Sequence, residues 1–387
     1  MRVAQFTDTF LPVVDGVGRV VSHYAQTMGD LCEACYVIAP RQEGLELQSA
    51  PYELIDYRSI RLPKMPQYRA GLPGLDARYR RRLATLKLDI AHAHSPFVAG
   101  REAYRVARRQ GIPLVATFHS KYYEDFYQLT KSKSLSKLGV KFVVEFFSKC
   151  DQVWAVSHAT ADVLRDYGYR GVIEVVENGS NRKEPSAAAA RMAEERYGLG
   201  DVPVLLFVGQ MNWKKNIRRI LEAVEVLARQ GREFRLVLAG QGPSEKEIRQ
   251  LSSAMGLEHF VVHVGHVSDA ELLEGLYNRA DLFVFPSLYD SAPMVVREAA
   301  AVGTPSLLAL GSSAAEVVRD GENGLLAHDT TKDMAERIAW ALDHPEELKQ
   351  IGSAARRTIP KPWKDIVVGV LERYASLIRT TGNVRRF

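Results

Sequence analysis

The segment FPSLYDSAPMVVREAA (285–300) contains two carboxylates whose spacing suits the binding of a sugar or a nucleotide. A helix is expected to begin near Pro293 or Met294. Asp290 then lies in the loop beside the free N–H groups of the helix start, and Glu298 lies about one turn into the helix. Carboxylates placed in this way can accept hydrogen bonds from sugar hydroxyls while the N–H groups bind an anion, but they can also simply cap the helix.

Two lysines follow a glycine turn in the segment FVGQMNWKKN (207–216). Gly209 ends an apolar run, and Lys214 and Lys215 stand just before the next helical stretch. Positive charge in this position suits the neutralisation of a diphosphate, although surface lysines are common. Two further glycine turns, GQG (240–242) and GHV (265–267), follow the next two apolar runs.

The first half of the chain has a glycine turn and a histidine in comparable positions. Gly16 and Gly18 precede a helical stretch, where backbone N–H groups can approach an anion, but the third glycine of GxGxxG is missing and a plain tight turn remains the alternative. His119 ends the apolar run LVATFH (114–119), so we expect it at the carboxyl end of a strand, among ligand-binding groups. His92 and His94 lie within a strand and are expected to pack or cap.

The apolar runs that precede these turns predict the architecture. Runs of four to six apolar residues alternate with helical stretches, which is typical of buried parallel sheets with crossover helices. The first half contains the candidate strands 3–6, 35–39, 90–94, 114–119, 153–157 and 172–176. The second half contains the candidate strands 204–209, 235–240, 260–265, 282–287 and 305–310. Two such series predict an α/β chain with two doubly wound, Rossmann-like domains, whose active site lies in the cleft between them.

Composition places the domain boundaries. The turn-rich stretch NGSNRKEP (178–185) precedes an Ala-rich helix that ends in glycine. We therefore expect an acceptor-binding domain over 1–185, a nucleotide-sugar-binding domain over 186–360, and a C-terminal helix over 361–387 that packs towards the first domain.

The 387 residues include 46% hydrophobic and 25% charged residues, which is ordinary globular composition. No apolar stretch is long enough to span a membrane, and three cysteines cannot build a disulfide framework, so a cytoplasmic protein is expected. Cys32 and Cys35 form an isolated CxxC that is interpreted as structural. Residues 51–150 contain 19 basic and 8 acidic residues, a net +11 that suits an anionic membrane surface, a phosphorylated substrate or a nucleic acid. Of these three partners, a nucleic acid is not expected.

Taken together, these segments resemble the GT-B glycosyltransferases of family 4, which are retaining enzymes that use nucleotide sugars. The resemblance covers nearly the whole chain. The family has an acidic residue, seven intervening residues and a glutamate before an Ala-rich segment that ends in Gly-Thr-Pro. Here that pattern is Asp290 followed by EAAAVGTP (298–305), with GENGLL (321–326) after it. The N-terminal FTDTFLPVVDGVGRVV (6–21) resembles the glycolipid-forming subgroup.

The resemblance implies roles for particular residues. His119 would contact the transferred sugar, Lys215 the diphosphate, and Asp290 the hydroxyls of the donor sugar, so these three are the expected catalytic residues. Glu298 would bind the ribose. The full set of donor-binding residues implied is Gly16, Gly209, Gln210, Lys215, Gly265, Val267, Ser291, Ala292, Pro293, Met294 and Glu298. No metal and no cofactor is expected, since lysine, amides and a helix dipole supply the positive charge.

Three positions depart from the family pattern. Gln210 stands where an arginine is usual, Asp290 replaces the commoner glutamate, and NGSN (178–181) replaces a typical NGID. Despite these departures, the resemblance implies metal-independent front-face transfer of a hexose-type sugar, with a UDP-sugar favoured as donor. A sugar-nucleotide epimerase and a non-catalytic partner subunit are the alternatives; a nicotinamide oxidoreductase lacks its GxGxxG here.

Residues 121–150 follow His119 and are expected to border the acceptor side of the site. Basic and apolar residues recur there at helical spacing: Lys133, Lys137 and Lys141, and Leu135, Leu138, Phe142 and Phe146. A basic amphipathic segment predicts peripheral contact with an anionic membrane, on its inner face, and a lipid-linked acceptor. An ordinary helix packed on the sheet, with a soluble sugar or polysaccharide as acceptor, is the alternative.

Overall fold

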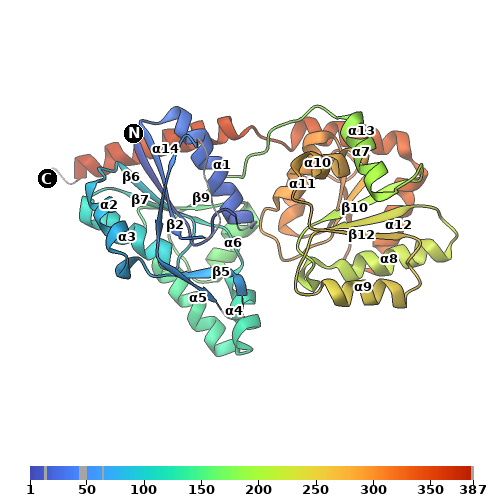
Figure 1. Ribbon diagram of the computed structural model, residues 1–387, viewed down its shortest axis with the longest axis horizontal. Coiled ribbons are helices and arrows are strands. Elements are labelled where there is room, and N and C mark those ends of the chain that lie inside the picture. The colour runs from blue at the N-terminus through green and yellow to red at the C-terminus, as the bar shows by residue number, and fades with distance from the viewer. Residues whose placement is uncertain (13–14, 43–49, 63–64, 385–387) are drawn as a thin grey trace. The chain divides into compact units, whose positions relative to one another are not determined.

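The computed structural model describes residues 1–12, 15–42, 50–62 and 65–384. They form two compact units, one of Met1–Gly179 with Trp363–Phe387 and the other of Ser180–Pro362. Each unit contains a parallel sheet with helices against it (Figure 1), which confirms the predicted α/β class. Among the residues described, no helix has both the length and the apolar composition needed to cross a membrane.

The first unit has a seven-stranded sheet in the order β3-β2-β1-β6-β7-β8-β9, and every pairing in it is parallel. A separate antiparallel hairpin, β4–β5, follows β3. The elements of this unit are β1 (Arg2–Phe6), α1 (Gly16–Leu31), β2 (Ala34–Pro40), β3 (Glu53–Tyr57), β4 (Ser59–Leu62), β5 (Met65–Gly71), the 3-10 helix η1 (Pro73–Leu75), α2 (Ala77–Thr85), β6 (Ile90–Ala93), α3 (Val98–Gln110), β7 (Leu114–Phe118), α4 (Tyr122–Thr130), α5 (Lys133–Phe147), β8 (Gln152–Ala155), α6 (His158–Asp166), β9 (Ile173–Val175) and α14 (Trp363–Val384).

The two faces of this sheet differ in chemistry. Side chains alternate between faces along a strand. One face presents small and aromatic apolar residues to α3, and this apolar core includes Ala4, Phe6, Ala91, Ala93, Ala116 and Phe118. The intervening residues belong to the opposite face, where α1 and α14 pack against each other, and they include polar side chains such as Gln5, His92 and Thr117.

The second unit has a six-stranded sheet in the order β12-β11-β10-β13-β14-β15, also parallel throughout. Its strands are short apolar runs, and all five residues of β10 are buried. The elements are α7 (Ala187–Tyr197), β10 (Val204–Val208), the 3-10 helix η2 (Trp213–Lys215), α8 (Ile217–Arg229), β11 (Arg235–Ala239), α9 (Glu245–Ala254), β12 (Val261–Gly265), α10 (Ala270–Arg279), β13 (Leu282–Phe285), α11 (Met294–Val302), β14 (Ser306–Ala309), the 3-10 helix η3 (Ser313–Val317), β15 (Leu325–Ala327), α12 (Thr331–Asp343) and α13 (Pro345–Thr358).

All eleven candidate strands of the sequence coincide with strands of the two sheets, but the described part of the chain contains four further strands that were not predicted. β3 reads ELIDY, and its two acidic residues break the apolar pattern. β15 has three residues, which is too short for a pattern to register. β4 and β5 lie outside the main sheet and are not apolar runs. The cysteine of the CxxC that begins the second predicted strand, Cys35, is buried in β2, and both Cys32 and Cys35 are free thiols.

Candidate functional site

The predicted lysine and aspartate meet at the centre of the second sheet. β10 and β13 are neighbours there, and the chain leaves them towards opposite edges, so the crevice beyond their carboxyl ends is where doubly wound sheets bind ligands. Lys215 lies in the turn after β10 and Asp290 in the turn after β13. Lys215 Nζ is 2.5 Å from Asp290 Oδ1, and the two side chains are only 15% and 18% exposed.

The Asp290 carboxylate has one oxygen that this ion pair does not use. Oδ2 is buried and has no hydrogen-bond partner among the described residues. A buried acceptor without a donor is costly, and a ligand hydroxyl could supply the missing bond. Beside the pair, the Tyr289 ring lies under two ammonium groups, with its centroid 4.5 Å from Lys214 Nζ and 5.8 Å from Lys215 Nζ.

Asn216 holds the two turns together and was not predicted. It adopts a left-handed conformation with φ of 60°, which asparagine tolerates better than most residues, and it begins α8. Its Nδ2 donates to the carbonyl of Pro286 (3.2 Å) at the end of β13 and to Asp329 Oδ1 (2.9 Å). The turn with the lysines is thereby fixed against the strand that leads to Asp290.

Glu298 lies on α11, four residues after the helix begins at Met294, as the sequence predicts. Its Oε2 accepts a hydrogen bond from the Tyr277 hydroxyl of α10 (3.0 Å), a partner that the sequence did not indicate. Ser291, Ala292 and Pro293 lead into α11, and all three are partly buried. The first N–H groups of an α-helix lack partners within the helix and favour an anion.

The glycine turns align along the carboxyl edge of the sheet. Gly209 N donates to the carbonyl of Ala239 (3.0 Å), and Gly240 N donates to the carbonyl of Gly265 (2.7 Å). Gly240 has φ of 137°, and a Cβ added there would lie 1.9 Å from the Gly209 carbonyl oxygen, so only glycine fits. Val267 is partly buried beyond this edge, whereas Gln210 is exposed. No group of three or more His, Cys, Asp or Glu among the described residues is arranged to hold a metal ion.

The start of α1 in the first unit already holds a carboxylate. Asp15 is its N-cap, and Asp15 Oδ1 accepts from Gly18 N (2.6 Å). Burial raises the pKa of Asp15, against the effect of its hydrogen bonds. This carboxylate accepts a hydrogen bond from an amide that a phosphate would otherwise use. The binding of an anion at Gly16 stays a prediction.

Asp8 is a second buried carboxylate that the sequence did not single out. It follows β1, its Oδ2 accepts from the Ser95 hydroxyl (2.5 Å), and its Oδ1 accepts from Ala99 N (3.0 Å). Asp8 therefore caps the first turn of α3 from the neighbouring strand, a role that its position just after an apolar run could have suggested. Desolvation raises its pKa, although both hydrogen bonds oppose the shift.

His119 follows β7 directly and is 8% exposed. Its Nε2 is 3.0 Å from His94 Nδ1, and His94 Nε2 is 2.6 Å from Gln5 Oε1. His92, two residues before His94 on the same face, has its Nε2 2.7 Å from Thr117 Oγ1. Burial lowers the pKa of His119 to about 3 and holds the pKa values of His92 and His94 well below 6.5, so all three rings are neutral at pH 7.

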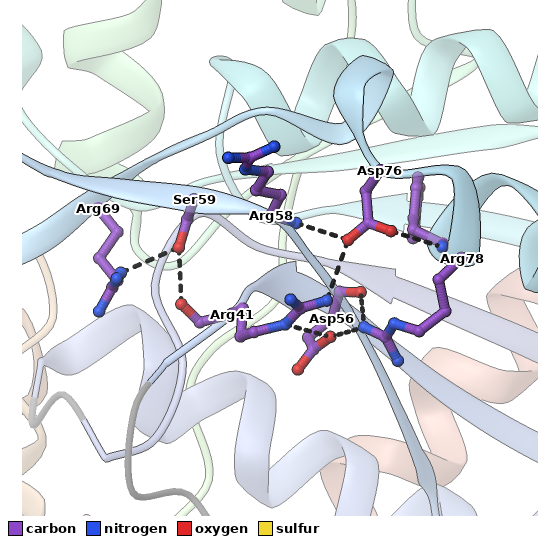
Figure 2. Close-up of polar contacts among 8 residues, drawn as sticks. Arg41, Asp56, Arg58, Ser59, Arg69, Asp76 and Arg78 are labelled. Atoms are coloured by element: carbon purple, nitrogen blue, oxygen red, sulfur yellow. Dashed lines mark hydrogen bonds and ion pairs between the residues drawn. The ribbon is translucent and has the colours of Figure 1, made fainter.

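Part of the basic stretch is neutralised locally. Figure 2 shows Arg41 between two carboxylates, with Nε 3.2 Å from Asp56 Oδ1 and Nη2 3.0 Å from Asp76 Oδ2. Asp56 also pairs with Arg78, and Asp76 Oδ2 accepts from Arg58 N (3.0 Å). These contacts tie the end of β2, the edge strand β3 and the start of α2 together, so this cluster is scaffold.

The predicted amphipathic segment is two helices, α4 and α5, that pack against each other. Four large apolar side chains on them are between 40% and 62% exposed: Tyr127, Leu129, Leu135 and Leu138. Four lysines beside them are also exposed: Lys131, Lys133, Lys137 and Lys141. Phe146 is buried in the core, and the Arg101 guanidinium lies 4.2 Å from the centre of the Phe142 ring, so these two phenylalanines do not extend the exposed surface. We call the eight exposed residues the α4–α5 surface.

Comparisons with known proteins agree with this architecture. The model of the family "Glycosyltransferase Family 4" matches residues 14–184, and that of "Glycosyl transferases group 1" matches residues 193–358. The chain is 26% identical to a GDP-mannose-dependent alpha-mannosyltransferase of Corynebacterium glutamicum, over 98% of this chain and 89% of that protein. It is 23% identical to an alpha-monoglucosyldiacylglycerol synthase of Acholeplasma laidlawii, over 92% of each chain.

Solved structures show the same fold. HepE of Anabaena, in complex with UDP and glucose, superposes with a TM-score of 0.80 at 18% identity, covering 97% of this chain and all of that one. Sucrose-phosphate synthase of Thermosynechococcus elongatus gives 0.82 at 19% identity, covering 98% of this chain and all of that one. The fold and the two family models therefore define a glycosyltransferase with two doubly wound parallel sheets. The chain belongs to the GT-B glycosyltransferases of family 4.

Proposed function

We propose that this enzyme transfers a hexose from a nucleotide diphosphate sugar, preferably a UDP-sugar, to an acceptor hydroxyl with retention of the anomeric configuration. The observation that carries the proposal is the ion pair of Lys215 with Asp290 at the centre of the second sheet, where one Asp290 oxygen is buried and unpartnered among the described residues. A cation and a free acceptor side by side suit a ligand that presents a phosphate next to a hydroxyl.

Donor binding is assigned to the second unit. On binding, Lys215 moves from Asp290 to the diphosphate, and Asp290 and the amides of Ser291–Met294 bind the sugar hydroxyls. Glu298, held by Tyr277, accepts from the ribose hydroxyls. The backbone at Gly265–Val267 contacts the base, and the turn of Gly209 and Gln210 lies beside the phosphates.

The proposed transfer is a front-face displacement. The acceptor oxygen forms its bond to the anomeric carbon on the face from which the nucleoside diphosphate departs, and the departing phosphate oxygen takes the acceptor's proton. The enzyme contributes positioning and the stabilisation of negative charge on the leaving group, through Lys215 and the N-terminus of α11. These groups make the reaction independent of a metal ion.

The acceptor is proposed to be lipid-linked and to be reached through the α4–α5 surface. Exposed leucines and a tyrosine stand among exposed lysines there, which is the composition of a surface that enters the interface of an anionic membrane. The similarity to an enzyme named for the synthesis of a glucosyldiacylglycerol agrees with this assignment. A soluble glycan acceptor is the alternative.

The donor is tested with a panel of nucleotide sugars that includes UDP-glucose, UDP-galactose and GDP-mannose. Purified enzyme is incubated with each donor and a diacylglycerol or membrane lipid extract, and the released nucleotide and the product anomer are measured. We expect turnover of a UDP-sugar with retained configuration, undiminished by EDTA. Inverted product, or activity that EDTA abolishes and Mg²⁺ restores, contradicts the mechanism, and turnover of GDP-mannose alone contradicts the UDP preference.

The membrane contact is tested by co-sedimentation with anionic and neutral vesicles. The variant is Leu135→Ser with Leu138→Ser, and the matched control is Val172→Ser, since Val172 is an 82% exposed apolar residue elsewhere on the same unit. We expect salt-sensitive binding to anionic vesicles that the leucine variant loses and the control keeps. Equal and negligible binding to both vesicle types would contradict the membrane contact and would favour a soluble acceptor.

A further inference from the structure

A continuous line of buried polar side chains crosses the sheet face that α1 and α14 cover in the first unit. Its members come from four different elements and are each at most 8% exposed: Gln5, His92, His94, Thr117, His119 and Tyr374. The opposite face of the same strands is apolar. A buried polar group costs free energy unless it is hydrogen-bonded, so each hydrogen bond in this line must have one atom that donates and one that accepts.

The Gln5 side chain sets the direction of the hydrogen bonds. Its Nε2 is 3.2 Å from Met28 Sδ and 3.3 Å from the Tyr374 hydroxyl oxygen, and its Oε1 is 2.6 Å from His94 Nε2. A thioether sulfur accepts hydrogen bonds but cannot donate them, so the amide nitrogen must face Met28. The amide oxygen then faces His94, and His94 must carry its proton on Nε2.

The position of the proton on His94 determines the state of His119. Both rings are neutral, because burial lowers both pKa values, and a neutral imidazole has one N–H. His94 Nδ1 is therefore an acceptor. His119 Nε2, 3.0 Å away, donates to it, which leaves His119 Nδ1 without a proton. Among the described residues, His119 Nδ1 has no hydrogen-bond partner of its own.

We infer that Gln5 and His94 are positioning residues that hold His119 in the Nε2–H tautomer, so that its Nδ1 offers substrates an acceptor and never a donor. This rests on the proposed function, together with the expectation from the sequence that His119 contacts the transferred sugar. The group that His119 selects is then a hydroxyl that donates. Replacing that hydroxyl by fluorine, which cannot donate, removes the bond.

Tyr374 joins the C-terminal helix to the same line of hydrogen bonds. Its hydroxyl oxygen accepts from Gln5 Nε2, so its own proton goes to His92 Nδ1, and His92 Nε2 donates to Thr117 Oγ1. Each member of the line then has its proton in the direction that Gln5 sets. The line of hydrogen bonds that contains His119 thus reaches a side chain of α14, more than 250 residues away in the sequence.

The tautomer is measured by long-range ¹H–¹⁵N NMR on ligand-free protein labelled at histidine, with His119→Gln to assign the signal. We expect a protonated Nε2 and an unprotonated Nδ1 for His119 at pH 7. A proton on Nδ1 overturns the inference. The measurement needs no substrate, so its failure is distinct from a failure of the nucleotide-sugar panel, which overturns the proposed function instead.

A variant of Gln5 distinguishes control of the His119 tautomer through His94, which we call the relay, from a purely structural role of Gln5. In Gln5→Glu, the carboxylate pairs with His94 and charges it, His94 Nδ1–H then donates to His119 Nε2, and His119 shifts to the Nδ1–H tautomer. We expect this shift with a roughly tenfold fall in kcat/KM, the loss of about one hydrogen bond. Tyr374→Phe, which leaves the contact of Gln5 with Met28 and His94, is expected to keep the wild-type tautomer. An unchanged His119 in folded Gln5→Glu contradicts the relay.

Discussion

The two sheets place different chemistry at corresponding points. At the centre of the second sheet, a lysine and an aspartate form an ion pair with one buried carboxylate oxygen to spare. At the centre of the first sheet, between β1 and β6, the polar groups are neutral histidines and an amide, joined in a chain and almost fully buried. The same topology therefore supports an ion pair in one unit and a chain of neutral, hydrogen-bonded side chains in the other, where the Asp8 carboxylate caps α3.

The difference follows from what each unit is proposed to bind. A departing nucleoside diphosphate carries negative charge, and a preorganised cation stabilises it. A sugar hydroxyl is neutral and needs directed hydrogen bonds, which a histidine of fixed tautomer supplies without the cost of burying a charge. The comparison predicts that changes of charge matter most in the second unit and changes of proton position in the first.

The largest expected effect comes from removing the lysine. Lys215→Ala should lower kcat by about a hundredfold or more, since one charged contact to a leaving group is typically worth roughly 2.7–4 kcal/mol. Lys214→Ala is the matched control, because Lys214 lies over the Tyr289 ring and not in the ion pair with Asp290. The measurement is kcat of both variants at a saturating donor concentration. Equal losses of kcat would show that Lys215 has no role in the reaction that Lys214 lacks.

A somewhat smaller effect is expected at the predicted ribose contact. Glu298→Ala should lower kcat/KM for the donor by one to two orders of magnitude, since hydrogen bonds to a charged group are worth about 1.5–3 kcal/mol. Tyr277→Phe, which removes only the hydroxyl that Glu298 accepts from, should cost less than Glu298→Ala. Donor kinetics of both variants, with circular dichroism to confirm folding, test the order; the reverse order would mean that Tyr277 itself binds the donor.

The neutral histidines of the first unit should appear in the pH dependence of stability. Their folded pKa values are depressed, so the unfolded state takes up protons as the pH falls below about 6.5 and the folded state does not. Above that pH each histidine is neutral in both states and the free energy of unfolding does not depend on its titration. Below it, each histidine lowers the free energy of unfolding by about 1.4 kcal/mol per pH unit until the pH reaches the folded pKa. Asp8 and Asp15, with raised pKa values, act in the opposite sense.

The contribution of one histidine is isolated by a difference. Urea unfolding of wild type and His94→Gln between pH 7 and 5 should show a shallower loss of stability on acidification in the variant. Parallel pH curves for the two proteins would contradict the assignment of a neutral, buried His94.

The smallest effect is expected for the scaffold cluster of Figure 2. Asp76→Ala removes the N-cap of α2 and should lower the free energy of unfolding by about 0.5–2 kcal/mol. Donor kinetics should be unchanged, because no predicted site residue contacts Asp76. A large loss of activity in a folded Asp76→Ala protein would move this cluster from scaffold to substrate binding.

The sequence predicted most strands of the two sheets, because they appear as short, continuous apolar runs. It missed β3 and β15, where acidic residues or shortness hide the pattern. It singled out Lys215 and Asp290 as candidate site residues from turns that follow strands, and Glu298 from its place near the start of a helix. It did not predict the contact of Lys215 with Asp290, because no local segment of the sequence determines the order of strands in a sheet. The contact of His94 with His119 depends in addition on the register of β6 against β7, which spacing along the chain does not give.

The central claim is that Lys215 serves the diphosphate of the donor. It is tested most directly by calorimetric binding of a nucleoside diphosphate and the corresponding monophosphate, UDP and UMP, to wild type, Lys215→Ala and Lys214→Ala. We predict that UDP binds more tightly than UMP to wild type and to Lys214→Ala, and that the preference collapses in Lys215→Ala. A preference for UDP that survives unchanged in Lys215→Ala would contradict the account.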